Sequence, residues 1–464
     1  MTGISTDYDV VVVGGGPSGT MAAVAAARNG AHTLIIDQAG FLGGSLTSMG
    51  VGPMMTFFAG DKQVIKGLAQ ELIDRLVKQH FSPGHVPDAT NYVSYNTPFD
   101  AEGLKLTLDT MTQEAGVDVL FHTMLVDAVK EGDRVTSIQV ANEDGLTNIS
   151  SKTFIDATGN ADLALKVGVP FNLGREEDNL TQPMTLNMKL YNVDTEEIRR
   201  DVLAHKERFP RAERDLDAFN NAARVAVSGY EEEFRQARMD GELSIPRKDL
   251  LFFETNTPGE YIVNATRILS NGSFDAKTLS DAEIQGRIQC HELFVWLRKT
   301  IPGFEHCQIE FTGPNIGVRQ SRQIRGSYYL TTEDFASHKK FASTIAHTPY
   351  PMDIHSPMGS GYGTPNDYHE SDPSSFDRDS LRDYHDIPFE VMTVPEYSNL
   401  AVTGRCVSVD FNVQASIRTT PTVMILGQAC GAAAALATAS SSNFHQVDVA
   451  QLRKTLKNQG AYLD

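Results

Sequence analysis

The fold of this chain is decided near its start, by the stretch Tyr8-Asp9-Val10-Val11-Val12-Val13-Gly14-Gly15-Gly16-Pro17-Ser18-Gly19. Four consecutive valines bounded by glycine predict a strand that is buried on both faces of a parallel sheet. Gly14, Gly16 and Gly19 then match the spacing G-x-G-x-x-G. In that motif the first glycine permits a tight turn, the second lets backbone approach a pyrophosphate, and the third lets the next helix lie close to the strand.

The residues that follow complete a dinucleotide-binding unit. Residues 20–28 are rich in alanine, which suits a helix lying tight against a sheet, and Asn29-Gly30 supplies a left-handed helix end. A second apolar strand, residues 33–36, runs into Asp37, 23 residues after Gly14, where an acidic side chain contacts the ribose in such units. The glycine spacing alone would also fit an ordinary glycine-rich turn. Because strand, helix, second strand and acid follow in register, we predict dinucleotide binding.

Composition narrows the classes of function. The 464 residues are 41% hydrophobic and 21% charged, as in ordinary globular proteins, and are enough for two or three structural units. A net charge of −19 argues against nucleic acid or an anionic membrane as a partner. No Cys-x-x-Cys pair occurs, so we expect no dithiol centre, no iron–sulfur cluster and no metal site.

The N-terminus and one apolar segment bear on location. The first strand begins within about eight residues, which leaves no room for a signal or transit peptide, so we expect a cytoplasmic protein. Residues 423–439 are apolar but rich in small side chains and include Gln428. This composition favours a buried core helix over a membrane span.

A change of composition in the middle of the chain predicts an inserted domain. Residues 194–249 are charge-rich and helical in pattern, and Ser280-Asp281-Ala282-Glu283 forms a capping box for a helix that continues to Lys299. Residues 345–388 are irregular and predict either a binding loop or a disordered segment. Glycine-rich strand–helix signals return after Asn399. We therefore predict an α/β fold with a discontinuous Rossmann-like domain, residues 1–170 and 389–464, and an inserted α+β substrate or cap domain, residues 171–388.

This arrangement favours FAD over a nicotinamide cofactor, because FAD enzymes often close their cofactor between an N-terminal unit and a segment near the C-terminus. Thr420-Pro421 stands at a predicted helix start, and the positive end of that helix dipole would favour the reduced form of a flavin beside it. The alternative is that Pro421 simply begins a core helix. No second G-x-G-x-x-G unit follows, so a stably held NAD(P)H domain is not expected.

At these motifs the sequence resembles the FAD-dependent oxidoreductases of the glutathione-reductase-like superfamily. The resemblance covers almost the whole chain and extends through Gly40-Phe41-Leu42-Gly43-Gly44, Ile155-Asp156-Ala157-Thr158-Gly159, Gly317-Val318-Arg319-Gln320-Ser321-Arg322-Gln323-Ile324, Tyr350-Pro351-Met352-Asp353-Ile354-His355, Gly404-Arg405-Cys406-Val407-Ser408 and Ala415-Ser416-Ile417-Arg418-Thr419-Thr420-Pro421. It implies that FAD is lined by Gly14, Gly16, Pro17, Ser18, Asp37, Gln38, Gly44, Ser45, Thr47, Val126, Ala157, Thr158, Gly159, Arg405, Ser416 and Ile417. The sequence departs from the family pattern at Asn160, Gln320, Gln323 and residues 411–413. If those positions touch substrate, the substrate differs from that of the relatives.

Several residues are candidates for catalysis. His355 is the first candidate for the base, since a neutral imidazole titrates near working pH, and its alternative is to be one of several histidines of the loop without a chemical role. Tyr384 and His385 are a second candidate pair. Arg319 lies three residues before Arg322, so a helical segment would let the two clamp an anionic group, and the alternative is a salt bridge to the acidic surface. A fifth candidate, Arg418, adjoins the predicted flavin-facing helix start.

The sequence therefore predicts an FAD-dependent oxidoreductase that transfers a hydride between a small organic substrate and tightly bound flavin. The absence of Cys-x-x-Cys suggests direct transfer, with a separate electron donor or acceptor as a possible partner. Two alternatives remain open at this point: a flavoprotein hydroxylase that uses NADPH and oxygen, and a protein that holds FAD structurally for non-redox chemistry or assembly.

Overall fold

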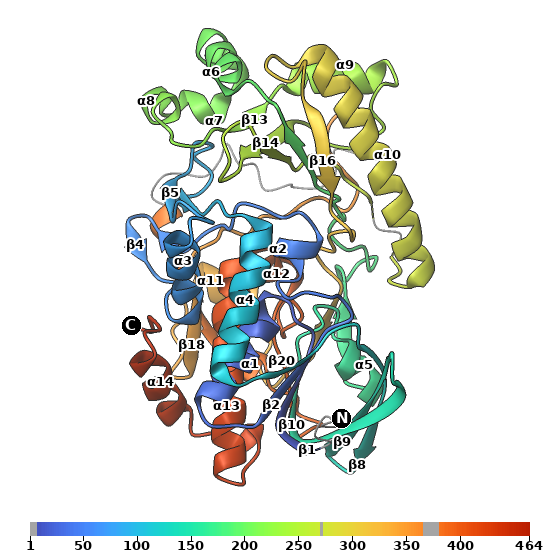
Figure 1. The fold of residues 1–464 in the computed structure, drawn as a ribbon, viewed down its shortest axis with the longest axis vertical. Coiled ribbons are helices and arrows are strands. Elements are labelled where there is room, and N and C mark those ends of the chain that lie inside the picture. The colour runs from blue at the N-terminus through green and yellow to red at the C-terminus, as the bar shows by residue number, and fades with distance from the viewer. Residues whose placement is uncertain (1–6, 270–271, 365–379) are drawn as a thin grey trace.

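The computed structural model describes residues 7–269, 272–364 and 380–464, which form two tiers (Figure 1). The lower tier in Figure 1 contains the central sheet with helices α1 (Pro17–Arg28) and α13 (Thr420–Ala439). The upper tier contains helices and strands from the middle of the chain. His369, one of the loop histidines, lies outside the described residues, as do residues 365–379 of the predicted binding loop.

The central sheet is parallel at its core. Its parallel strands lie in the order β7 (Asp118–Leu120), β2 (Thr33–Ile36), β1 (Asp7–Val13), β10 (Gly145–Asp156) and β20 (Leu400–Val402). Strand β9 (Arg134–Asn142) pairs antiparallel with the first half of β10, and β8 (Met124–Glu131) pairs antiparallel with the other edge of β9. The last strand, β20, returns from the C-terminal part of the chain to pair with β10. The predicted α/β, Rossmann-like fold is confirmed.

The four valines of β1 explain why this strand lies at the centre. Val10 and Val12 belong to the buried cluster that contains α1 and α13, whereas Val11 and Val13 belong to the cluster on the opposite face. Successive side chains of a strand point to opposite faces, so a continuous apolar run is buried twice. Full burial of each such side chain contributes roughly 1.5–3 kcal/mol.

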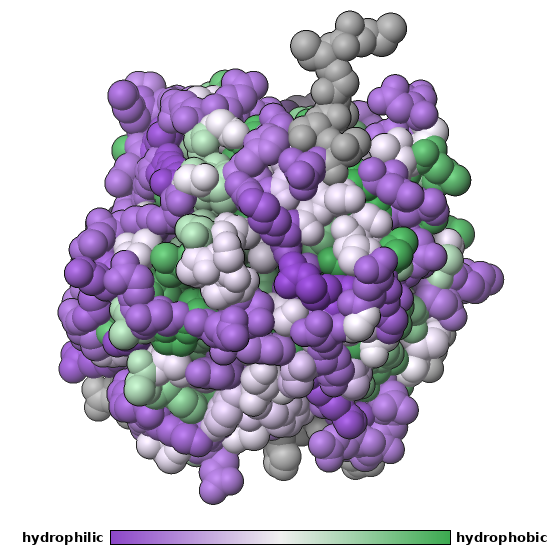
Figure 2. Space-filling model, turned by 90° about the horizontal axis from the view of Figure 1, so that it is seen from below, coloured by the Kyte–Doolittle hydropathy of each residue, from purple (hydrophilic) through white to green (hydrophobic). Residues whose placement is uncertain are grey.

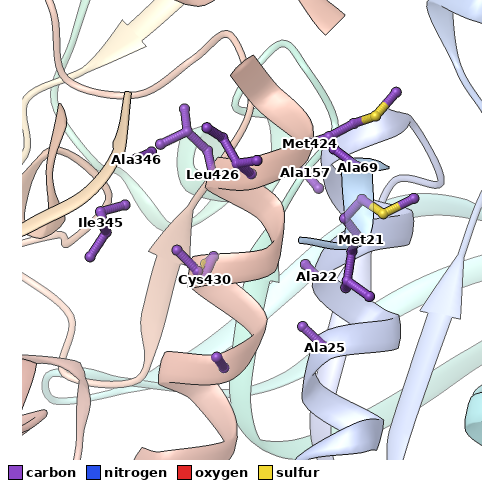
Figure 3. Packing of buried hydrophobic residues seen from close by; sticks show 14 of the residues in the cluster. Met21, Ala22, Ala25, Ala69, Ala157, Ile345, Ala346, Met424, Leu426 and Cys430 are labelled. Atoms are coloured by element: carbon purple, nitrogen blue, oxygen red, sulfur yellow. The ribbon is translucent and has the colours of Figure 1, made fainter. Parts of the chain in front are cut away.

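Helix α13 lies beside α1 (Figure 3), and two of its glycines meet the α1 backbone. A Cβ atom at Gly427 would lie 2.0 Å from the Ser18 carbonyl oxygen, and one at Gly431 would lie 2.0 Å from that of Ala22. The alanines of α1 therefore touch α13 almost backbone to backbone. By length and apolarity α13 could cross a membrane, but 83% of its apolar window is buried inside the protein, as expected for a core helix.

The upper tier has its own sheet and its own core. Its antiparallel strands lie in the order β13 (Ala226–Gly229), β14 (Leu250–Glu254), β15 (Tyr261–Val263), β12 (Met188–Tyr191) and β16 (Gln308–Thr312). Around it lie α6 (Thr195–Ala204), α7 (Pro210–Glu213), α8 (Leu216–Asn220), α9 (Glu231–Met239) and α10 (Ala276–Thr300). A separate buried cluster fills this tier. Its mixture of helices and strands is the α+β composition expected of the insert.

The remaining elements complete the lower tier and its margins. The helices are α2 (Ser45–Ser48), α3 (Leu68–Lys78), α4 (Ala101–Ala115), α5 (Asp162–Val167), α11 (Thr332–Ala336), α12 (Phe411–Ile417) and α14 (Val449–Asn458). The strands are β3 (Phe58–Ala59), β4 (Lys62–Gln63), β5 (Val86–Pro87), β6 (Tyr95–Asn96), β11 (Phe171–Leu173), β17 (Arg322–Ile324), β18 (Thr344–Thr348) and β19 (His385–Pro388). The face shown in Figure 2 is mostly hydrophilic, with apolar residues scattered among polar ones.

Two local expectations differ from the structure. Helix α10 begins at Ala276, where the Asp275 carboxylate caps the Thr278 N–H, and the Ser280 hydroxyl instead bonds back to the Ala276 carbonyl. The earlier aspartate is an equally good cap and lets the helix gain another turn. Strands β18 and β19, inside the predicted insert, pair with each other and place Ile345 and Ile387 in the cluster around α1 and α13.

Candidate active site

The three motif glycines have different surroundings. Gly14 has a φ of +105°, and a Cβ atom there would lie 2.5 Å from the Ala157 carbonyl oxygen. A Cβ at Gly19 would lie 1.9 Å from the Gly14 oxygen. A Cβ at Gly16 would meet nothing within 4 Å. Gly14 and Gly19 are therefore required by packing, and Gly16 borders open space at the N-terminus of α1, which has no side-chain cap.

The acidic residue lies where the motif predicts it. Asp37 follows β2, and its two carboxylate oxygens accept hydrogen bonds from the Gly15 N–H at 2.5 Å and the Ala39 N–H at 2.7 Å. Burial raises the pKa of Asp37, against the effect of these two donors. The second glycine loop lies on the first turn, since the Gly43 N–H donates to the Gly15 carbonyl at 2.8 Å.

The other residues of the predicted FAD lining lie around the ends of the central strands. The Ser18 and Thr403 hydroxyl oxygens are 2.8 Å apart, so α1 is joined to the turn after β20. Arg405 donates to the Asn160 side-chain oxygen at 2.7 Å, its buried Nε has no hydrogen-bond partner in the described part of the chain, and burial lowers its pKa. An orphaned donor beside an open glycine turn fits a group that brings its own acceptors.

The rest of this set is spread over short elements, as follows. Pro17 is in the first turn of α1, Gln38 follows Asp37 at the surface, and Gly44 and Ser45 begin α2. Thr47 donates from α2 to the Leu42 carbonyl, and Val126 is at a bulge of β8. Ala157, Thr158 and Gly159 follow β10, and Ser416 and Ile417 end α12. The N–H of Thr123 donates to the Asp37 carbonyl at 2.9 Å, so the chain that leads into β8 lies beside the acid.

One cavity of about 620 Å³ lies between the two tiers. From the lower tier it is lined by Ser45, Arg405, Thr419 and Thr420, and from the upper tier by residues of β13 and β14 with Arg267. A third wall comes from the segment after β18. That segment contributes Tyr350, Asp353, Ile354, His355 and Ser360. The part of the predicted binding loop that the structure describes thus reaches the cavity.

His355 lies between a carboxylate, that of Asp353, and a guanidinium, that of Arg267. Its Nε2 lies 3.2 Å from Asp353 Oδ2, and its Nδ1 lies 3.2 Å from Arg267 Nη2. Arginine can only donate, so Nδ1 is the acceptor and the imidazole proton is on Nε2, directed to Asp353. Burial lowers the pKa of His355 to about 4, Arg319 and Arg267 add to this effect, and Asp353 opposes it. His355 is therefore neutral near pH 7.

Asp353 also binds Arg418. Arg418 Nη2 lies 3.2 Å from the Asp353 carbonyl oxygen and 3.3 Å from Oδ2, and its buried Nε has no hydrogen-bond partner among the residues described. Burial works against the Asp353 carboxylate, but His355 and Arg418 outweigh it and hold its pKa well below the usual range. The Tyr350 hydroxyl donates to the same carboxylate at 3.3 Å.

Arg319 lines the cavity, but Arg322, with which it was expected to form a clamp, does not. Its Nη1 donates to the Pro183 carbonyl at 2.8 Å and to the Thr185 hydroxyl. Arg322 instead binds Asp162 at 3.0 Å. The expectation of an Arg319–Arg322 clamp was wrong because residues 322–324 form β17 and not a helix, so the two side chains do not share a helical face.

The Tyr384–His385 pair is elsewhere and is not part of the cavity lining. The Tyr384 hydroxyl accepts from Lys62 at 3.1 Å, and the His385 ring stacks on Phe335 with centroids 4.1 Å apart. Burial lowers the pKa of His385 to about 4. The expectation that these two residues serve the site is thus not supported by their position, which follows from the pairing of β19 with β18. Among the described residues, no three His, Cys, Asp or Glu side chains gather as metal ligands.

Sequence reasoning missed the cationic residues of the upper wall. Arg211, Arg247, Lys248 and Arg267 line the cavity but stand singly or in one pair in the sequence, far from any motif. Only the fold gathers them, so no local pattern signals their role. Asp353 did carry a signal, because it stands two residues before His355 within a family motif.

The fold and the glycine turn define a dinucleotide-binding enzyme, and comparison with known proteins gives its family. Residues 9–456 match the model of the FAD dependent oxidoreductase family, so the chain belongs to that family and its cofactor is FAD. The resemblance noted in the sequence is confirmed at this level.

Relatives match only part of the chain. It is 35% identical to thiamine thiazole synthase of Aeropyrum pernix over 28% of this chain and 43% of the relative. It is 25% identical to digeranylgeranylglycerophospholipid reductase of Thermoplasma volcanium over 33% of this chain and 39% of the relative. The matched part is thus under half the length of each. Among solved structures, the flavin-dependent brominase Bmp2 is similar at a TM-score of 0.49 and 12% identity, covering 97% of this chain and 83% of that one.

Proposed function

We propose that this enzyme transfers a hydride between a small organic substrate and tightly bound FAD, within the cavity between the two tiers. One observation carries the proposal. Residues beside the nucleotide turn, among them Ser45 and Arg405, and a neutral histidine, His355, line the same cavity of about 620 Å³. Cavities of this size suit small ligands with a few convergent polar groups.

The residues that would hold FAD follow from the geometry described above. The open backbone at Gly16 suits the pyrophosphate, Asp37 the ribose, and the orphaned Nε of Arg405 an acceptor of the cofactor. Thr419 and Thr420 begin α13 at the cavity wall, and this helix has no side-chain cap. When bound, FAD supplies a two-electron carrier for hydride transfer.

His355 is the proposed base. It is neutral near pH 7, and its single lone pair, on Nδ1, is the one that can accept a proton. Asp353 accepts from Nε2–H and so fixes the tautomer and the ring orientation. Arg418 binds Asp353 and borders the start of α13, which places a positive charge between the base and the proposed flavin end.

The broader parts of the proposal rest on the sequence. The motifs support a place near the glutathione-reductase-like superfamily. The change of composition supports a substrate or cap domain within residues 171–388, except for β18 and β19, which pack in the cluster around α1 and α13. We also propose a cytoplasmic location. A separate donor or acceptor of electrons would complete the cycle, since we identify no second dinucleotide motif in the sequence.

Anaerobic titration tests this function. Purified holoenzyme is mixed with sugars, hydroxy acids, amines and enoates, and the flavin absorbance is followed for bleaching or, after chemical reduction, for its return. The proposal expects a response to one class, and His355→Gln should slow it by roughly 10²–10⁴-fold without loss of FAD. Substrate-stimulated oxygen consumption with NADPH would instead indicate a hydroxylase. A flavin that never changes redox state would indicate a structural role.

A further inference from the structure

The cavity has the opposite charge to the whole chain. The chain carries a net charge of −19, yet among the described residues the cavity lining holds more cations than carboxylates. The cations are Arg211, Arg247, Lys248, Arg267, Arg319, Arg405 and Arg418, and the carboxylates are Glu231, Asp249 and Asp353. An acidic protein would not collect this set by composition alone, so the wall is built for negative charge.

The three carboxylates are already engaged by cations of the same wall. Glu231 binds Lys248 at 3.2 Å, Asp249 binds Arg247 at 3.2 Å, and Asp353 binds Arg418 at 3.3 Å. None of the described carboxylates lies within ion-pair distance of Arg319. Arg319 is therefore an enclosed cation of this wall for which the described residues supply no ion-paired carboxylate.

The surroundings of Arg319 oppose its charge. Burial lowers the pKa of Arg319 well below its usual range, Arg418, Arg267 and Arg247 add to this effect, and Asp353 opposes it without reversing it. Its two hydrogen bonds go to a carbonyl and a hydroxyl, neither of which neutralises a guanidinium. An enclosed cation that faces three others and no ion-paired acid is stabilised most by an added anion.

We propose that the substrate of this enzyme carries an oxyanion, a carboxylate or phosphoryl group, that binds Arg319 and Arg267. This inference rests on the proposed function, because it names the substrate class of the same cavity. The anion competes with His355 Nδ1 for the Nη2 donor of Arg267, which lies 3.2 Å from that nitrogen. An anion that takes the Arg267 donor therefore also frees the lone pair on His355 Nδ1.

The proton balance of this event follows from the groups around His355. Asp353 faces it on one side and Arg267 on the other, with Arg319 nearby. Arg418, Tyr350 and Tyr92 act on His355 through Asp353. An anion between Arg319 and Arg267 offsets the positive charge that these two guanidinium groups exert on His355, and it leaves Asp353 in place. His355 then binds a proton more readily, and the proton comes from solvent when the ligand has none to give. Anion binding should therefore take up protons, more so at pH 6 than at pH 8.

Calorimetric titration of oxidised holoenzyme tests the inference without any turnover. The probes are butanoate and butyl phosphate, with butanamide and 1-butanol as uncharged matches of similar shape. We expect at least one acid to bind more than about 10-fold tighter than its uncharged match, with proton uptake measured from buffers of different ionisation heat. Butanoate and butyl phosphate separate the two sources of the oxyanion. Equal binding of charged and uncharged probes, no binding of either acid at millimolar concentration, or binding without proton uptake would overturn the proposal.

Variants locate the anion. Arg319→Gln and Arg267→Gln should each weaken binding of the acid by about 10- to 100-fold. Arg325→Gln is the control, since it makes the same charge change at an exposed residue outside the cavity and should bind as wild type does. If Arg319→Gln does not fold, Arg319→Lys keeps the charge but not the planar fork and should still bind the acid less tightly. Normal binding by the Arg319 variants would refute the assignment.

The two proposals fail separately. If the holoenzyme binds anions preferentially but no substrate reduces its flavin, the hydride-transfer function is contradicted and the anion site is retained. If uncharged compounds reduce the flavin and Arg319→Gln has no effect, the anion site is contradicted and the hydride-transfer function is retained.

Discussion

Substitutions at Gly14 and Gly16 should separate folding from cofactor binding, although the two residues stand two apart in one turn. Gly16 has φ −67° and ψ −179°, a backbone conformation that any residue adopts, and its Cβ would point into open space. Gly14 has φ +105° and a Cβ position 2.5 Å from a carbonyl oxygen. We predict that Gly16→Val folds but does not retain FAD, and that Gly14→Ala folds poorly.

The magnitudes follow from these surroundings. Gly14→Ala adds backbone strain of about 1–3 kcal/mol and overpacking of about 1–3 kcal/mol, together a large part of a stability of roughly 5–15 kcal/mol. Gly16→Val adds neither. It places three carbons where the pyrophosphate would approach the N-terminus of α1, and the loss of two charge-assisted contacts costs roughly 3–6 kcal/mol. FAD affinity should then fall by about 10²- to 10⁴-fold.

The assay compares the two apo proteins and their flavin content. Flavin is measured by absorbance after gel filtration, and stability by denaturant unfolding after the flavin has been removed. Apo Gly16→Val should unfold within about 1 kcal/mol of apo wild type, and apo Gly14→Ala well below it. Full flavin occupancy in Gly16→Val would refute the placement of the pyrophosphate, and equal stability of the three apo proteins would refute the packing role of Gly14.

Three further predictions concern the site and the helix behind it. Burial lowers the pKa of His355 to about 4, below its ordinary value of about 6.5, so the unfolded chain binds this proton first and stability falls from pH 6.5 toward pH 4. Unfolding at pH 7.5 and pH 5 should show that His355→Gln removes up to about 2 kcal/mol of this loss, and an unchanged acid limb would contradict it. Arg418→Ala should lower the flavin midpoint potential by roughly 30–65 mV with FAD still bound, and Arg418→Lys should recover part of the change; identical midpoints in a redox titration would leave Arg418 a structural role. Gly431→Leu should push α13 from α1 and destabilise the protein by several kcal/mol in denaturant unfolding. Ser441→Ala, at an exposed residue in the turn after the helix, should not.

The sequence was sufficient where a role is encoded in neighbouring residues. A short-range rule predicts each of three features: the run of valines, the three glycine positions and the acid after the second strand. The structure places the valines in β1 and brings the glycine turn and Asp37 together at the ends of β1 and β2. Buried α13 could be predicted for the same reason, from its small residues. Helix α10 shows the limit of such rules, because Asp275 and Ser280 are both competent caps and the local pattern does not choose between them.

The substrate side could not be predicted because its residues meet only after folding. Arg267 reaches His355 across 88 positions of sequence, and Arg319 contacts the carbonyl of Pro183 across 136. The pairing of Arg319 with Arg322 required a helix where the chain forms a strand, and Tyr384 and His385 are carried away by the β18–β19 pairing. Distance along the chain, and not residue type, separated correct from incorrect predictions.

The charge of the cavity also limits how it can select a ligand. A chain with a net charge of −19 repels anions at long range, so the cavity cations do not steer an acid toward the protein from a distance. At physiological salt the Debye length is about 8 Å, and beyond it the cations of the wall are screened from solvent. Inside the cavity, between the two tiers, the same guanidinium groups act at contact distance and with little screening. Selection of the proposed anionic substrate would therefore depend on contact with Arg319 and Arg267 after entry, and removal of either guanidinium should abolish the preference for acids over their uncharged matches.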